Sequence, residues 1–366
     1  MERDEHYHPT SCPDPFKEMR YWAQKQLGST YSYTLWLACD TLSNKFVILR
    51  VHKTAQHYNT MAWKEIGVLV DIASKNGDAH VVKLLDFFTH NGPNGAHVCM
   101  VFELMGDNLL ELGKHYDYKG IPLNMVKGIC SSVLGGLDYL HRQHSIIHTG
   151  LSPENIVLPF TAEPTGYLSM SGVPILLPHT ANSDLKCKIA GLSNACWTHK
   201  NLLSDIQSCG AYTCPEILLV SEFSTSADIW SLGCIVFQLV TGKLLFDRYD
   251  IAVDHLAQMI ELLGAMPKEI ACGGHRSARY FHSDGSLKAN RVSQSRSLIN
   301  EVREMYSEED ADEFCNFLLP LLDFAPHKRP TAAEALLHPW LNPGPRILQP
   351  SVRMQRRDNG APEKKT

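Results

Sequence analysis

The first third of the chain has the short alternating pattern of a β-sheet. Apolar runs separated by turn residues predict strands at 34–38, 46–51, 82–88 and 97–102. Between the second and third of these runs, apolar residues recur at helical spacing over residues 62–74 and predict one helix. The pattern therefore predicts a small sheet-rich lobe over residues 21–104 with a single helix among its strands.

Beyond residue 105 the apolar positions follow the period of a helix instead. Residues 124–141 place their apolar side chains on one helical face, and further helices are predicted at 255–263, 309–322 and 331–338. Residues 225–241 are apolar almost throughout, which indicates a helix buried at the centre of a domain. A larger helical lobe, residues 105–342, thus follows the sheet.

Three segments show neither pattern. Residues 1–20 are mostly polar and predict a loose N-terminal arm. Residues 159–187 contain several prolines and glycines and predict an irregular insertion. Residues 343–366 carry six basic residues against two acidic ones, and we expect this tail to be disordered.

Composition narrows the functional classes. The 366 residues are 44% hydrophobic and 20% charged, as in an ordinary globular protein. The net charge of −5 argues against a protein that coats nucleic acid, so we expect no direct nucleic-acid partner. No apolar run reaches the ~18 residues of a membrane span, and the first residues lack the apolar core of a signal peptide. We therefore expect no membrane partner.

The cysteines indicate a reducing compartment. There are 11 of them, an odd number, and no two are spaced as Cys-x-x-Cys. This spacing favours neither a disulfide framework nor a zinc site. We expect free thiols and a cytoplasmic or nuclear location, or both.

Eight short motifs follow one another in the order found in protein kinases. They lie at 27–35 (glycine loop), 46–50 (lysine strand), 65 (helix glutamate), 146–155 (catalytic loop), 188–193 (metal-binding loop), 214–216, 228–231 and 329–330. The chain thus resembles a protein kinase. This resemblance implies an α+β, bilobal fold with a β-rich N-lobe over 21–104 and an α-helical C-lobe over 105–342.

Other runs resemble the serine/arginine-rich splicing-factor protein kinases, called SR-protein kinases below. That family has Thr within its catalytic loop, as at Thr149, and a run similar to Ala-Gly-Leu-Ser-Asn-Ala-Cys-Trp at 190–197. Further similar runs lie at 199–200, 205–207, 262–264 and 338–341, and the insertion 159–187 lies where the family has a spacer. The resemblance implies phosphate transfer from ATP, with Mg²⁺, to arginine/serine-rich proteins.

The residues expected to perform catalysis depart from this family pattern. Gly150 stands where an Asp orients the substrate hydroxyl, and Gly191 where a second Asp binds magnesium. Ser152 replaces the catalytic-loop Lys that neutralises the transferred phosphate. Asn155 is retained as a metal ligand, but one amide oxygen is a poor substitute for a carboxylate toward Mg²⁺.

The nucleotide site departs from the pattern as well. The resemblance assigns it to Gly28, Ile48, Arg50, Glu65, Glu103, Met105 and Val157. Arg50 keeps the charge of the usual Lys but not its shape, although it can still pair with Glu65. Ile48 replaces a small Ala above the adenine, and Thr30 replaces the second glycine of the loop. We therefore expect neither ATP nor Mg²⁺ to bind tightly.

Residues that stabilise the kinase fold are retained. The resemblance predicts an ion pair between Glu216 and Arg329 and places Asp228 where it accepts backbone donors from the catalytic loop. We interpret His148 as a packing residue of the catalytic loop rather than as a base.

Each catalytic substitution alone could be tolerated, but together they remove the base, a metal ligand and the phosphate clamp. The sequence therefore predicts a pseudokinase. Three classes stay open: a binding protein for arginine-rich partners, a kinase with unusual residual chemistry, and a paralogue without a selected function.

One binding feature of the family has a counterpart. Asp254 and Glu261 are seven residues apart and so share one helical face. They match the acidic residues with which the family docks arginine-rich segments, and carboxylates accept paired guanidinium bonds. The family's Trp in this groove has no counterpart in 291–298. The alternative interpretation is a solvated helix face.

Overall fold

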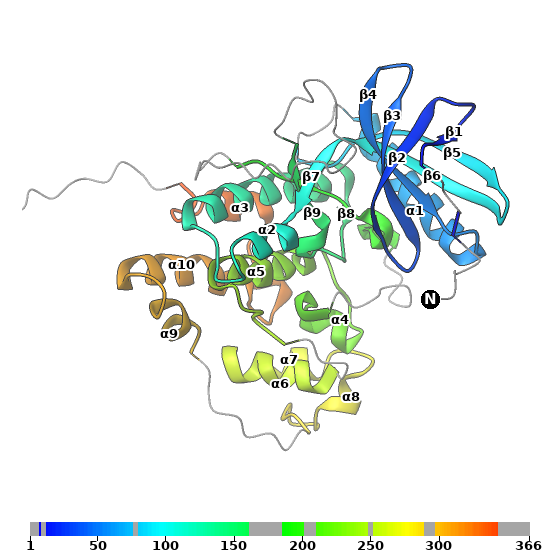
Figure 1. Cartoon of the computed structure of the whole chain (residues 1–366). Helices are drawn as coiled ribbons and strands as arrows, with labels where there is room; N and C mark the ends of the chain where they lie inside the picture. Colours follow the sequence, from blue (N-terminus) through cyan, green and yellow to red (C-terminus); the bar gives the residue numbers. More distant parts are fainter. Residues whose placement is uncertain are drawn as a thin grey trace, which may run out of the picture.

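Six antiparallel strands form the sheet of the small lobe, in the order β1-β2-β3-β4-β6-β5 (Figure 1). The computed structural model describes residues 7–8, 12–75, 80–160, 185–200, 210–247, 252–288 and 297–342. The strands are β1 (Asp14–Phe16), β2 (Tyr21–Ser29), β3 (Tyr33–Asp40), β4 (Lys45–His52), β5 (Leu84–Gly92) and β6 (Gly95–Glu103). The four predicted strands are confirmed as β3, β4, β5 and β6.

Strand alternation decides which residues of the small lobe reach the site. In β4, Val47, Leu49 and Val51 point into a core shared with β1, β2 and β3. The residues between them, Ile48 and Arg50, therefore face the opposite side, where the interlobe cleft lies. Helix α1 (Gln56–Ser74) covers that side of the sheet next to β5 and β6.

The N-terminal arm is shorter than predicted. Strand β1 pairs with β2, so Phe16 lies opposite Tyr21 and is only 1% exposed. The prediction of a loose arm over 1–20 is therefore wrong for residues 12–20. A strand of three residues is too short to show an alternating pattern, and it is held by burial of the Phe16 ring.

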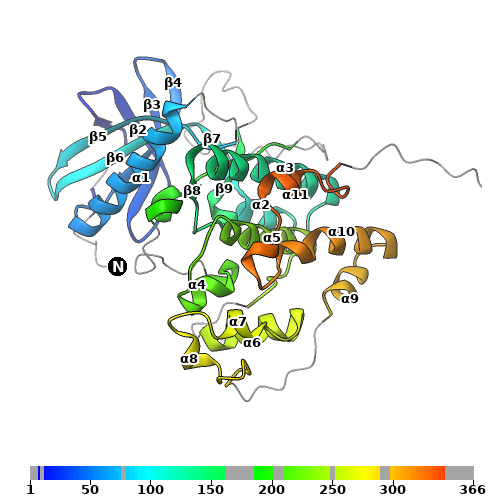
Figure 2. The same ribbon diagram turned by 180° about the vertical axis from the view of Figure 1, so that it is seen from behind.

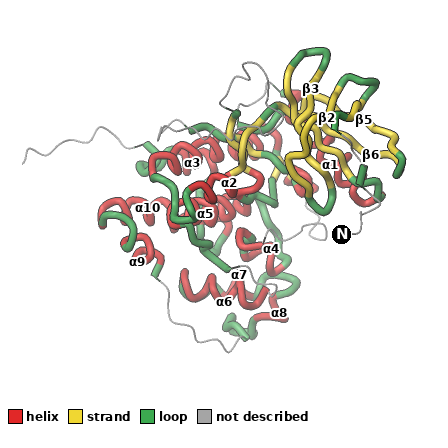
Figure 3. Tube along the Cα trace, in the orientation of Figure 1, coloured by secondary structure: helices red, strands yellow, loops and turns green. Residues whose placement is uncertain are grey.

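The large lobe is helical and is built around one buried helix, as Figures 2 and 3 show. Helix α5 (Ser226–Thr241) is buried along almost its whole length. Around it lie α2 (Leu109–His115), α3 (Leu123–Asp138), α4 (Pro215–Leu219), α6 (Ala252–Leu263), α7 (Lys268–Ala271), α8 (Ser277–Tyr280), α9 (Leu298–Arg303), α10 (Glu308–Leu321) and α11 (Ala332–Leu336). The predicted helices are confirmed, with ends that differ by a few residues.

Five short strands follow the small-lobe sheet, and three of them contribute residues that line the cleft between the lobes. They are β7 (Met105–Asn108), β8 (Ile146–Ile147), β9 (Ile156–Pro159), β10 (Lys188–Ile189) and β11 (Cys196–Trp197). Strand β9 lies between β7 and β10 in one small sheet, and β8 pairs with β11. The sequence analysis missed these strands because two to four residues show no periodicity.

The predicted insertion has narrower limits than 159–187. Pro159 is the last residue of β9 and lies opposite Met105. At the other end Leu185 and Cys187 are buried in the main core. The remainder of that segment, residues 161–184, and the tail 343–366 lie outside the described residues.

Two further sequence expectations can be compared with the described part of the chain. The cysteines within it are all free thiols, in line with the expected reduced state. In the same part of the chain, no helix combines the length and the apolar character needed to cross a bilayer.

Buried histidines make the stability of this fold sensitive to acid. Burial lowers the pKa of His255 from 6.5 to about 4. The unfolded chain therefore binds a proton at this residue between those two pH values and the folded chain does not, so stability falls as the pH falls through this window. His255→Phe keeps the ring beside Phe246 without the titration.

We expect urea unfolding to show that, between pH about 7 and about 4, the wild type loses about 3 kcal/mol more than the His255→Phe variant. Parallel losses in the two proteins would contradict this assignment.

Candidate functional site

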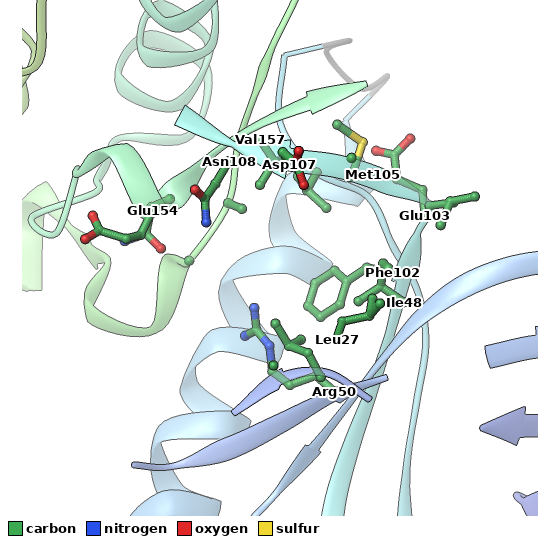
Figure 4. A pocket seen from close by; sticks show the side chains of 18 of the residues that line it. Leu27, Ile48, Arg50, Phe102, Glu103, Met105, Asp107, Asn108, Glu154 and Val157 are labelled. Carbon is green, nitrogen blue, oxygen red and sulfur yellow. The ribbon is translucent and has the colours of Figure 1, made fainter. Parts of the chain in front are cut away.

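A cleft of about 750 Å³ separates the two lobes. This volume is within the range of small-molecule sites. Figure 4 shows Leu27, Ile48 and Phe102 on the small-lobe side of the cleft, with Met105 and Val157 across from them. The structure thus brings together the predicted nucleotide residues Gly28, Ile48, Arg50, Glu65, Glu103, Met105 and Val157.

Arg50 and Glu65 form a buried ion pair at the back of this cleft. The Nη1 atom of Arg50 donates to both carboxylate oxygens of Glu65, at 3.0 and 2.9 Å. Burial opposes the charge of Arg50, but the Glu65 carboxylate outweighs it and raises the pKa of Arg50 above its ordinary value. The predicted pair between β4 and α1 is therefore present.

Two aromatic rings fix the guanidinium of Arg50. Its Cζ atom lies 4.5 Å from the ring centre of Tyr33 and 4.8 Å from that of Phe102. Cation–π contacts of this kind favour Arg, because its planar group stacks on a ring where an ammonium cannot. Arg50 is thus held by Glu65, Tyr33 and Phe102 within the protein itself.

Tyr33 is a site residue that the sequence analysis missed. It occupies the last position of the glycine-loop motif, where the third glycine of the kinase pattern would stand. The missing third glycine was the signal that could have identified it. Its ring fills space above Arg50 that a glycine would leave open.

The glycine loop is closed on itself by Thr30. The backbone N–H of Thr30 donates to Tyr33 O at 2.8 Å, and its Oγ1 accepts from the N–H groups of Ser32 and Tyr33 at 3.3 and 3.2 Å. The hydroxyl of Tyr7 also donates to Thr30 O. Backbone donors that a phosphate-binding loop offers to its ligand are therefore already in use.

Asp228 fixes the backbone of the catalytic loop. Its carboxylate accepts from the backbone N–H groups of His148 and Thr149 at 2.8 and 2.9 Å, and it contacts His141 Nε2 at 2.8 Å. Burial alone would raise its pKa, but the hydrogen bonds from His141 and from the backbone N–H of His148 lower the pKa of Asp228 below its ordinary value. The predicted role of Asp228 agrees with this geometry.

His148 has structural partners at both ring nitrogens. Its Nδ1 accepts from the backbone N–H of Gly150 at 3.2 Å, so we assign the proton to Nε2, which lies 2.9 Å from Ala190 O. The residue is completely buried. This arrangement links the catalytic loop to the segment before Gly191, as expected of a packing residue.

The catalytic-loop positions lack side chains able to activate a hydroxyl. Gly150 has none, and a Cβ placed there would lie 3.4 Å from Asn194 Nδ2, an ordinary contact. Ser152 precedes the turn Pro153–Asn155, and its carbonyl accepts from Asn155 N at 3.0 Å. A β-carbon is therefore accommodated at position 150, but no carboxylate is present there.

The metal position is filled by an amide. Gly191 adopts φ +74°, and a Cβ placed there would lie 2.1 Å from Asn155 Oδ1. The Nδ2 of Asn155 donates to Gly150 O at 2.9 Å, which holds the amide in this place. Among the described residues, no group of three His, Cys, Asp or Glu side chains is arranged to hold a metal. The residues present here do not fit a magnesium ion.

Glu103 lines the cleft, but its carboxylate oxygens are engaged by other residues of the protein. Its Oε1 and Oε2 accept from Lys188 Nζ at 2.6 and 2.7 Å, and Oε1 also accepts from Lys83 N at 2.8 Å. The ion pair between Glu103 and Lys188 links the end of β6, where the chain passes to the large lobe, to β10. Lys188 belongs to the metal-binding loop motif, and its contact with a residue 85 positions away leaves no local pattern in the sequence.

Acidic side chains line the mouth of the same cleft. Asp107, Glu111 and Glu154 are among its lining residues. Burial raises the pKa of Asp107, although His115 lies 3.7 Å away. With Arg50 already paired to Glu65, the cleft has a negative balance, which disfavours a phosphate that brings no metal.

The large-lobe ion pair forms as predicted. Arg329 donates to Glu216 through Nη1 and Nη2 at 2.6 and 2.9 Å, and to Ser226 O at 3.0 Å. Its guanidinium lies 5.0 Å from the ring centre of Trp230. The pair anchors α4, which contains Glu216, to the centre of the lobe.

The two predicted docking carboxylates lie on α6. Asp254 is in its first turn and Glu261 near its end, and both are half-buried. The neighbouring stretches 248–251 and 289–296, the second of which includes most of the segment compared with the family's Trp, lie outside the described residues. The shared helix agrees with the predicted common face but leaves their binding role a prediction.

The comparisons with known proteins agree with this architecture. The protein kinase domain model matches residues 21–341. The serine/threonine-protein kinase SRPK of Physarum polycephalum is 39% identical, over 93% of this chain and 90% of its own length. Protein kinase dsk1 of Schizosaccharomyces pombe is 31% identical, over 92% and 83%. SRSF protein kinase 3 of Homo sapiens is 28% identical, over 92% and 88%.

The geometry at Asn155 predicts opposite outcomes for the same substitution at two glycines. Gly191→Asp must place a side chain at positive φ and displace the Asn155 amide, so we expect a loss of roughly 1–3 kcal/mol in the free energy of unfolding. Gly150→Asp meets only an ordinary contact, and its cost is expected below about 1 kcal/mol. Urea titrations of both variants and the wild type measure the difference. An equal effect at the two positions would contradict this reading of the site.

Proposed function

The chain belongs to the SR-protein kinase family of serine/threonine protein kinases, and from this premise we propose that it is a catalytically impaired member that binds arginine-rich protein segments. The observation that carries this proposal is the pair of glycines at 150 and 191, with the Asn155 amide in the place of a metal-binding side chain. In this proposal the protein keeps the fold of the family but has lost its phosphoryl-transfer chemistry.

Phosphoryl transfer depends on electrostatic stabilisation and positioning. A metal ion bridging the phosphates supplies most of the positive charge in such sites. Here Gly191 offers no side-chain oxygen, and Asn155 Nδ2 donates a hydrogen bond to Gly150 O. The charge that Arg50 carries is directed at Glu65 and shielded by Tyr33 and Phe102. These contacts support a loss of phosphate activation.

The scaffold, in contrast, is held by contacts that need no nucleotide. Arg50 joins α1 to the sheet, Asp228 fixes the catalytic loop, and Arg329 holds the large lobe together. A protein whose two lobes are fixed in this way can present a constant surface to a partner. This supports a binding role rather than loss of all function.

The partner chemistry is inferred from α6. Asp254 and Glu261 lie two turns apart, and carboxylates bind guanidinium groups through paired hydrogen bonds. The human relative is named as a kinase of SRSF proteins. We infer that arginine/serine-rich segments bind along this helix by charge.

A working kinase is the second candidate, and one observation favours it. The ion pair between β4 and α1, which an active kinase requires, is formed through Arg50 and Glu65. In this alternative the protein phosphorylates arginine/serine-rich proteins with ATP, using a metal and base arrangement unlike that of its relatives. Nucleotide binding and transfer assays distinguish the two candidates.

The first expected outcome concerns nucleotide. A ligand raises stability by RT ln(1 + [L]/Kd), so negligible binding leaves the melting temperature unchanged. We expect ATP at millimolar concentration to shift Tm by less than about 1 °C, with or without Mg²⁺. The measurement is a thermal melt with ADP and EDTA controls. A clear Mg²⁺-dependent rise would favour the working kinase.

The second expected outcome concerns chemistry. Radiolabelled ATP and an arginine-serine peptide should give no transfer with the wild type or with Gly150→Asp alone, because residues that act as a unit are not additive. We expect transfer to require five changes together: Ile48→Ala, Arg50→Lys, Gly150→Asp, Ser152→Lys and Gly191→Asp. Turnover by the wild type, or by Gly150→Asp alone, would show that the site is less impaired than proposed.

The third expected outcome concerns docking. Replacing Asp254 and Glu261 together by Ala should weaken arginine-serine peptide binding by about tenfold, or ~1.4 kcal/mol, and wild-type binding should weaken as salt screens the charges. The matched control is Glu309→Ala with Glu313→Ala, which removes the same charge from exposed positions of α10. Peptide titration, with circular dichroism as a folding check, measures both. Equal affinities in the three proteins would show that Asp254 and Glu261 do not bind the peptide and belong only to a solvated helix face.

A further inference from the structure

Tyr7 links the start of the described chain to the glycine loop. Its hydroxyl donates to Thr30 O, and Lys53 Nζ lies 4.2 Å from the centre of its ring. Asn94, in the turn between β5 and β6, donates from Nδ2 to Tyr7 O at 2.8 Å. Residues 7 and 8 are called the strap below. Through Tyr7 the strap spans from this turn to a loop that lines the interlobe cleft.

The ring of His8 is inserted against β1 and β5. Its side chain is only 6% exposed, its Nε2 atom lies 3.2 Å from Asp14 Oδ2, and its ring centre lies 5.2 Å from that of Phe16. At the end of β5, a Cβ placed at Gly92 would lie 2.4 Å from His8 Nδ1. A side chain at position 92 would therefore displace the ring, and the glycine leaves open the slot that holds the strap.

Two more imidazole rings border this slot. The ring centres of His90 and His97 lie 4.9 and 5.2 Å from that of His8, and both contacts are edge-on. These three residues are called the histidine cluster below. His97 is fully buried, and its Nδ1 donates to His52 O at 2.7 Å. Its other nitrogen, Nε2, has no hydrogen-bond partner among the described residues, so a proton added there would be buried without an acceptor.

Burial keeps the histidine cluster uncharged near neutral pH. It is the largest cause that lowers the pKa of His8, His90 and His97 below 6.5, and charge on a neighbouring ring lowers each of them further. Asp14 raises the pKa of His8 and His90 without outweighing burial. Burial lowers the pKa of His52 to about 3, so that ring stays uncharged in the same range. The attached strap therefore holds fewer protons than a hydrated one when the pH falls below 6.5.

Other charged groups near the slot leave this balance unchanged. Asp86, farther along the same face of β5, accepts a hydrogen bond from Lys17 Nζ at 2.5 Å. Burial raises the pKa of Cys12, two residues before Asp14, so this thiol stays uncharged. Lys53, over the aromatic ring of the strap, adds a positive charge rather than a compensating negative one. Among the described residues, Asp14 is thus the carboxylate that faces the cluster, and one ring of the cluster already contacts it.

We propose that the strap is an acid-released latch on the glycine loop: protonation of the histidine cluster detaches residues 7 and 8 from the sheet and withdraws Tyr7 from Thr30. Positive charges on adjacent rings repel one another, and a proton on His97 Nε2 has no acceptor among the described residues. Detachment exposes these rings to water. The strap is therefore attached above pH about 6.5 and is released progressively below it. This latch is independent of the proposed binding of arginine-rich segments by α6, because the two use different lobes.

Hydrogen exchange of the full-length chain tests the release. The amides of residues 30, 32 and 33, which hydrogen-bond within the glycine loop, are followed at pH about 7.5 and about 5.5. Each rate is expressed relative to that of the unfolded chain at the same pH. A ring that is neutral in the attached strap and hydrated in the released one shifts the equilibrium by up to about tenfold between these pH values. We expect glycine-loop protection to fall by at least about threefold, with the α5 amides unchanged.

Three variants separate release of the strap from general acid sensitivity. His8→Phe together with His90→Phe keeps aromatic rings in the slot but removes two protonation sites, and it should reduce the pH-dependent loss by about half or more. Gly92→Ala keeps every histidine but fills the slot, so its glycine loop should be weakly protected at both pH values. The matched control is His282→Phe, which changes an exposed histidine of the large lobe and should behave as the wild type.

Histidine NMR tests the cluster without reference to the glycine loop. The Cε1–H signals of His8, His90 and His97, assigned with single replacements by Gln, are followed as a function of pH. In the wild type we expect each to titrate below 6.5, because the attached strap keeps the rings buried. In Gly92→Ala the His8 signal should titrate near about 6.5, the ordinary pKa of a hydrated ring.

Four results would overturn the latch. A wild type whose glycine loop keeps its protection in acid contradicts release, and equal pH effects in the wild type and the double Phe variant exclude the cluster as its cause. A loss that extends equally to α5 assigns the effect to unfolding of the whole domain. Full protection in Gly92→Ala shows that the strap does not hold the loop, and wild-type cluster signals that titrate near about 6.5 show that it does not bury the rings.

Discussion

The buried carboxylate of Asp228 is the constraint on which the rest of the site depends. It accepts two consecutive backbone N–H groups, those of His148 and Thr149, and thereby holds Thr149 at a positive φ of 60°. A non-glycine residue adopts this conformation only where its surroundings enforce it. This turn precedes Asn155, which lines the cleft and donates to Gly150 O. An isolated carboxylate would be costly at this depth, and these donors, with His141, make its charge tolerable.

This constraint explains how the scaffold can be independent of the chemistry. Removing one partner of a buried charge costs about 3–5 kcal/mol, so the Asp228 and Arg329 contacts are needed for folding whether or not phosphate is transferred. At Gly150 the missing carboxylate leaves none of the neighbouring described side chains with an unsatisfied buried atom. At Gly191 the Asn155 amide has taken the vacant volume and bonds to Gly150 O. Folding therefore does not oppose these two changes.

The sequence predicted those parts of the structure whose signal is long or repeated. The strands β3 to β6 and the helix α5 follow from their apolar periods, and the positions of Gly150, Asn155 and Gly191 follow from motif order. Strand β1 was mistaken for part of an arm because three residues show no period, although Phe16 is almost completely buried. Tyr33 and the Glu103–Lys188 pair also escaped prediction, because their partners are distant in sequence and only the folded chain brings them together.

Arg50 connects the chemistry of the cleft to the behaviour of α1. In a kinase the ion pair between this strand and the helix depends on how the helix is positioned, and that movement is a means of control. Here the guanidinium is clamped between Tyr33 and Phe102 while both oxygens of Glu65 accept from it. The two rings hold the Arg50–Glu65 ion pair in place without a bound phosphate, so this contact does not require α1 to change position. A helix fixed from its inner face presents its outer face in one position, and a fixed surface loses less conformational freedom when a partner binds it.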